Sequence, residues 1–90
     1  MTVGVRITGR LLRTDVTPLV SVAARDLPRA GPGGLRCDVR GAAPDLVTVE
    51  ALARLALLGR RHACRLHIEG ASPELRRLVH LAGLEWALHP

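Results

Sequence analysis

Side chains that could act as nucleophiles, bases or metal ligands are few in this sequence and poorly spaced for catalysis. The two serines, Ser21 and Ser72, lie outside any nucleophile-elbow pattern. No two histidines have the i, i+4 spacing of a helical metal site. Cys37 and Cys64 lack C-x-x-C spacing and are interpreted as small buried hydrophobes. The sequence therefore predicts a protein that is not an enzyme and that holds no metal and no cofactor.

One glycine-rich segment, Gly31-Pro32-Gly33-Gly34, has the composition of a phosphate-binding loop. It follows a predicted helix and enters a predicted strand, whereas phosphate-binding loops leave a strand and open a helix. We therefore interpret this segment as a linker.

The composition predicts a single domain over residues 1–90. Hydrophobic residues make up 48% of the chain, but it contains one Trp and no Phe or Tyr, so Leu, Val, Ile and Ala must form the core. The N-terminus lacks the apolar segment of a signal peptide, and no apolar run reaches the length of a membrane span. We therefore expect a cytoplasmic protein that does not bind membranes.

The formal net charge is +5, and all thirteen basic residues are arginine. Positive charge is one mark of nucleic-acid binding. The arginines are spread along the chain, however, and no Phe or Tyr lies among them to stack on bases. We therefore do not expect nucleic acid as a partner.

Strands and helices alternate along the sequence. Alternation of apolar and polar residues predicts strands at Val3–Ile7, Leu35–Val39 and Cys64–Glu69. A β-α-β-α-β-α order with short connections implies a small, mixed but mostly parallel sheet with a helix after each strand. In such sheets function tends to lie where the strands end and the helices begin.

Capping residues mark the three predicted helices. The first starts with Thr17 as N-cap and Pro18 at the first position, and Pro28 stops it. The second begins between Asp45 and Thr48, either of which could cap it. The second helix runs to Arg61, the third starts at Ser72-Pro73 and ends at Gly83, and a tail covers Glu85–Leu88.

Several motifs occur in a specific order. They are Ile7-Thr8-Gly9-Arg10, Asp38-Val39, Asp45, Gly59-Arg60-Arg61, Ser72-Pro73-Glu74-Leu75 and Ala82-Gly83-Leu84. In this order the chain resembles a STAS domain, the family of bacterial anti-sigma-factor antagonists and sulfate-transporter tails. The resemblance implies a protein-binding module that takes part in regulating transcription, with a regulatory protein such as an anti-sigma-type ATPase (a kinase) as partner.

The chain departs from the family at the phosphorylated turn. The family turn reads Asp-Ser-Ser-Gly or Asp-Thr-Ser-Gly, and its first hydroxyl is phosphorylated. Asp45 matches the acid, but Leu46 and Val47 stand at the two hydroxyl positions and Thr48 at the glycine. The resemblance therefore implies a binding surface without its usual switch, because leucine cannot carry phosphate.

Three hypotheses follow. The first is partner binding at an apolar turn and at a leucine that falls among charges, through Asp45, Leu46, Val47, Thr48 and Leu57. The alternative is a domain that senses a small ligand (a nucleotide, an anion or a lipid), with Ser72 and Arg76 as a candidate anion site at a helix start. A third is a homo-oligomer formed by pairing of Val3–Ile7 with a second copy.

Overall fold

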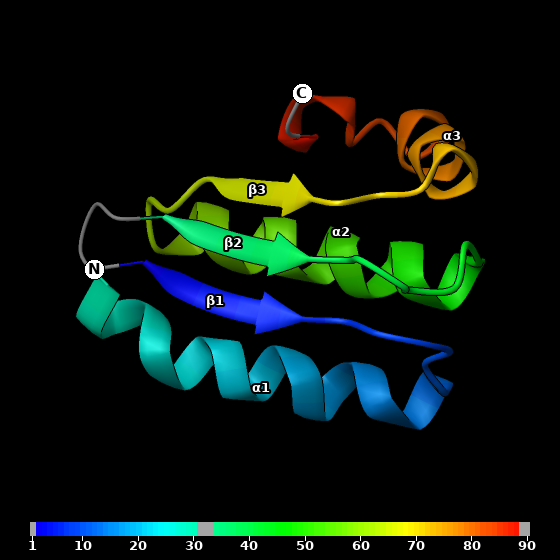
Figure 1. Ribbon diagram of the computed structural model, residues 1–90. Helices are drawn as coiled ribbons and strands as arrows, with labels where there is room; N and C mark the ends of the chain where they lie inside the picture. Colours follow the sequence, from blue (N-terminus) through cyan, green and yellow to red (C-terminus); the bar gives the residue numbers. More distant parts are fainter. Residues whose placement is uncertain (1, 31–33, 89–90) are drawn as a thin grey trace.

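The strands and helices follow one another as the sequence predicts. The computed structural model in Figure 1 describes residues 2–30 and 34–88, so most of the glycine-rich segment Gly31-Pro32-Gly33-Gly34 lies outside the described residues. In chain order the elements are β1 (Val3–Arg6), α1 (Arg13–Ala30), β2 (Leu35–Asp38), α2 (Leu46–Arg61), β3 (Leu66–Glu69), α3 (Pro73–Leu81) and the 3-10 turn η2 (Glu85–Ala87). The predicted α/β class is confirmed.

The three strands form a parallel sheet in the order β1-β2-β3. Right-handed crossovers between successive neighbours in this order place both connecting helices on the same face. Accordingly α1 and α2 pack against each other and cover one face, as Figure 1 shows. Val3, Cys37 and Ile68 are among the strand residues buried beneath them.

The opposite face of the sheet is charged. Arg6, Asp38 and Glu69 lie in register across the three strands. An ion pair joins Arg36 Nε to Glu69 Oε1 at 3.3 Å, and a longer one joins Arg6 Nε to Asp38 Oδ2 at 4.0 Å. Because these side chains remain solvent-exposed in part, the pairs add little stability. They keep this face polar, and each positive charge of a pair is balanced by a carboxylate.

The first helix is longer than the sequence predicts, and Thr17 is not its N-cap. It begins at Arg13, where Asp15 Oδ2 accepts a hydrogen bond from the Leu12 amide at 2.8 Å. Pro18 and Pro28 both lie inside the helix. The earlier start is favoured because it brings Val16, which is 1% exposed, onto the buried face.

The third helix has the predicted ends. Ser72 Oγ accepts a hydrogen bond from the Leu75 amide at 3.2 Å, and Pro73 occupies the first position. At the other end Gly83 has a φ of 77°, and the Leu84 amide donates to the Val79 carbonyl at 3.0 Å. This is a Schellman motif, which requires a left-handed residue best supplied by glycine.

The C-terminal tail closes the outer edge of the sheet beside β3. After η2, Leu88 forms a single parallel bridge with Ile68. Ala87 is fully buried, which fixes η2 against the core. On the opposite side β1 is the other edge of the described sheet, with Arg6 exposed along it. A charged residue on an open edge disfavours pairing with a second chain.

Candidate functional site

The connections after β1 and β2 meet at the carboxyl end of the sheet and form one continuous rim. The Gly9 amide donates to the Gly41 carbonyl at 2.8 Å, and the Ala43 amide donates to the Gly9 carbonyl at 2.8 Å. Gly9 and Gly41 have φ values of 66° and 77°, which favour glycine. The backbone thus continues the β1–β2 pairing beyond the strands and holds the start of α2 in place.

Asp45 is the N-cap of α2. Its Oδ1 accepts a hydrogen bond from the Thr48 amide at 2.9 Å, and its backbone is extended. Of the two caps that the sequence left open, Asp45 is therefore the one used, and Thr48 is not a cap. The carboxylate also lies at the positive end of the helix dipole, which stabilises it there.

Thr48 lies inside the molecule and not on the predicted binding surface. Its side chain is fully buried, and its Oγ1 finds no hydrogen-bond partner among the residues described. Thr48 and Leu52 are four residues apart and therefore lie on the same side of α2. Leu52 faces the core, and so does Thr48. A partner protein or a kinase approaching the rim cannot reach this hydroxyl.

Leu46 and Leu57 are both exposed on α2. The exposed fraction is 71% for Leu46 and 51% for Leu57. Eleven residues at 3.6 per turn bring two side chains back to within about 20° of the same direction. Ala53 lies between them in the sequence and is exposed as well. We call these three residues the α2 outer stripe; Val47 beside it is half-buried against the core.

The candidate anion site at Ser72 and Arg76 lies on the first turn of α3, where the Arg76 amide donates to the Ser72 carbonyl at 2.8 Å. Ser72 Oγ is engaged in the cap of α3. A shallow hollow of about 450 Å³ on the outer side of α3 is lined by Arg76, Arg77, His80 and Leu81. Ser72 does not line that hollow, and its hydroxyl is already used by the cap.

Both cysteines are buried, and no disulfide joins them. Burial, and to a lesser extent the neighbouring Asp38 carboxylate, raises the pKa of the Cys37 thiol to about 12. The thiol is therefore protonated at neutral pH and is not a nucleophile. No group of three or more His, Cys, Asp or Glu side chains in residues 2–30 and 34–88 is arranged to hold a metal ion.

One arrangement that no sequence pattern predicts lies at the amino end of the sheet. The Arg65 guanidinium carbon lies 5.3 Å from the ring centroid of Trp86, and Arg65 Nη2 donates to the Trp86 carbonyl at 3.3 Å. Trp86 is the only Trp, Phe or Tyr of the chain, and this rarity is the one sequence feature that could have marked it as a candidate site residue. Its contact with Arg65 depends on how the tail folds back, which no local pattern predicts.

Comparison with models of protein families, with curated proteins and with solved structures finds no match for this chain. Within the described part of the chain, the helices are too short or too polar to cross a membrane.

Proposed function

We propose that this protein is a STAS-like binding module that docks a regulatory protein, of the anti-sigma-type ATPase class, through the α2 outer stripe. The observation that carries the proposal is the exposure of Leu46 on the first turn of α2, directly beside the rim. A leucine held in water at a rigid helix start gains free energy only when a partner covers it.

The α2 outer stripe has the spacing that helix-mediated recognition uses. Leu46 and Leu57 are three turns apart, about 16 Å along the axis. Full burial of a leucine contributes about 1.5–3 kcal/mol, so covering two partly exposed leucines supplies about 2–4 kcal/mol to binding. The backbone hydrogen bonds of Gly9 to Gly41 and Ala43 fix the rim in advance, which lowers the entropy cost of docking.

The resemblance to STAS domains supports the choice of partner. Asp45 follows β2 and opens α2, as the matching acid does in the family motif. The usual phosphorylation switch has no counterpart, because Leu46 has no hydroxyl and the hydroxyl of Thr48 is buried. We therefore expect binding to the partner to be independent of phosphorylation.

The test is a calorimetric titration of the full chain with purified anti-sigma-type ATPases of the same organism. Leu46→Asp should weaken binding at least about tenfold, equivalent to about 1.4 kcal/mol. The variant should remain folded, because an acidic residue at a helix start is favourable. Leu81→Asp is the matched control, since Leu81 is 85% exposed on α3, and it should bind like the parent.

Incubation with the bound ATPase and ATP adds a second readout. Mass spectrometry should find no phosphate on residues 45–48. Absence of binding to every such ATPase, or equal binding by the parent and Leu46→Asp, would refute the docking proposal. Stoichiometric phosphate on Thr48 would refute the loss of the switch.

A further inference from the structure

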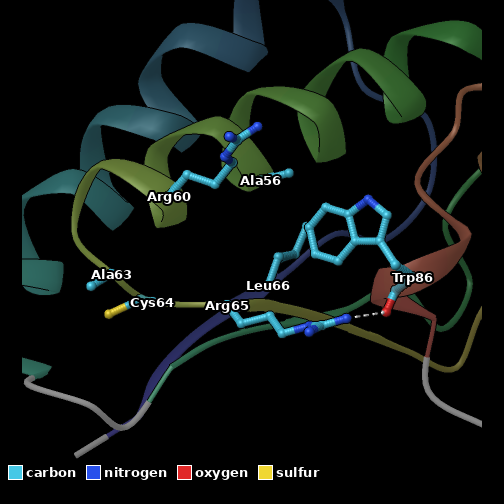
Figure 2. Close-up of a pocket in the computed structure, with 7 residues that line it drawn as sticks. All are labelled: Ala56, Arg60, Ala63, Cys64, Arg65, Leu66 and Trp86. Carbon is cyan, nitrogen blue, oxygen red and sulfur yellow. Dashed lines mark hydrogen bonds between the residues drawn. The ribbon is translucent and has the colours of Figure 1, made fainter.

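A pocket of about 440 Å³ lies at the amino end of β3, at the opposite end of the sheet from the rim. Figure 2 shows it between the end of α2, the α2–β3 connection and η2. Ala56, Cys64 and Leu66 form an apolar floor and are all almost completely buried. Volumes of this size are typical of sites for small molecules.

Two arginines give the pocket a positive charge. Arg60 lines it from α2 and Arg65 from the position just before β3, and the lining contains no carboxylate. Within the described residues the Arg60 guanidinium makes no hydrogen bond or ion pair. The arginines of the charged sheet face, by contrast, are neutralised; Arg36, for example, pairs with Glu69 at 3.3 Å. The unneutralised charge favours an anionic ligand.

Trp86 offers a flat apolar surface beside these charges. Its side chain is 41% exposed, although the next residue, Ala87, is fully buried. Arg65 holds the tryptophan from one side, through the 5.3 Å contact with the ring and the 3.3 Å hydrogen bond to its carbonyl. The part of the indole that Arg65 does not cover is open to solvent, and it can stack on an aromatic ring.

The side chains of the pocket can donate hydrogen bonds but offer no strong acceptor. Guanidinium and indole groups only donate, and a thiol sulfur accepts weakly. A nucleotide would leave its ribose hydroxyls and exocyclic amino group without acceptor side chains. A planar aromatic carboxylate has no donor to satisfy and matches the apolar floor.

From these features we infer that the pocket binds small aromatic carboxylates. The ring lies against Trp86 and the floor, and the carboxylate faces Arg60 and Arg65. The inference is independent of the α2 outer stripe, because none of these residues belongs to it.

Tryptophan fluorescence tests the inference directly. Trp86 is the only tryptophan and the chain has no tyrosine, so all emission reports on this pocket. Titration with cinnamate should change the emission saturably, with a dissociation constant of about 0.1–1 mM. N-acetyltryptophanamide corrects for light absorbed by the ligand, and calorimetry confirms the stoichiometry.

Variants and matched compounds separate charge from stacking. Arg60→Gln and Arg65→Gln should each weaken cinnamate binding about tenfold. The matched control is Arg61→Gln, which removes an exposed arginine outside the lining and should leave binding unchanged. Cinnamyl alcohol, which lacks the charge, and 3-cyclohexylpropionate, which lacks the aromatic ring, should both bind about tenfold more weakly.

Three outcomes would overturn the inference. One is the absence of a saturable signal up to the solubility limit of cinnamate. The second is equal loss of affinity in Arg60→Gln and Arg61→Gln, which would show a general effect of net charge. The third is tighter binding of AMP than of cinnamate, which would assign the pocket to nucleotides.

Discussion

The two ends of the sheet carry candidate surfaces that are built in different ways. At the carboxyl end the rim is held by backbone hydrogen bonds between Gly9, Gly41 and Ala43, and it presents Leu46 to solvent. At the amino end the pocket is assembled from side chains, with Arg65 against Trp86. An apolar, convex surface suits a protein partner, whereas a charged hollow suits a small anion.

The ends of α2 differ in the same way. At its start the Asp45 cap is a local motif within residues 45–48. At its end the Cys64 amide donates to the Gly59 carbonyl at 2.8 Å, and Ala63 takes a left-handed φ of 55° that glycine would adopt more easily. The backbone at the pocket end is therefore the more tightly constrained. We expect substitutions there to lower the free energy of unfolding more than substitutions at the rim.

The largest effect is expected from Gly59→Ala at the pocket end. An added Cβ would overlap the Cys64 carbonyl oxygen, which belongs to the backbone and cannot turn aside. We expect a loss of about 2–3 kcal/mol in the free energy of unfolding, measured by chemical denaturation. Gly4→Ala is the control, because a Cβ there meets nothing within 4 Å. Equal stability of the two variants would contradict the contrast between the ends.

A smaller loss is expected from Asp45→Ala at the rim. Removing the cap leaves the Thr48 amide without its 2.9 Å hydrogen bond, and we expect a loss of about 1.5 kcal/mol. Asp45→Asn retains a capping oxygen and should stay within a few tenths of a kcal/mol of the parent. If Ala and Asn were equally destabilised, the charge and not the cap would hold the start of α2.

The smallest effect, of opposite sign, is expected from Thr48→Val. The hydroxyl is buried without a partner, so its replacement by a methyl group of similar size should raise the free energy of unfolding by about 1 kcal/mol. Thr14→Val, on the exposed side of α1, should bring no such gain. A destabilised Thr48→Val variant would show that the hydroxyl has a role at the rim.

Prediction from the sequence succeeded where the determining residues are close together in the chain. The cap at Ser72 and the left-handed turn at Gly83 each depend on residues within one helical turn. It failed at α1, where Thr17-Pro18 has the form of a helix start. There the burial of Val16 outweighed the local pattern and moved the start of the helix toward the N-terminus.

By itself the sequence determined the order of strands and helices, the two ends of α3 and the absence of a hydroxyl at Leu46. These follow from periodicity and from short-range hydrogen bonds, which a linear pattern contains. Only the tertiary structure decided that Leu46 lies in solvent while Thr48 is buried, and that Trp86 meets Arg65. Such outcomes depend on which face of an element its neighbours cover, and those neighbours come from distant parts of the chain.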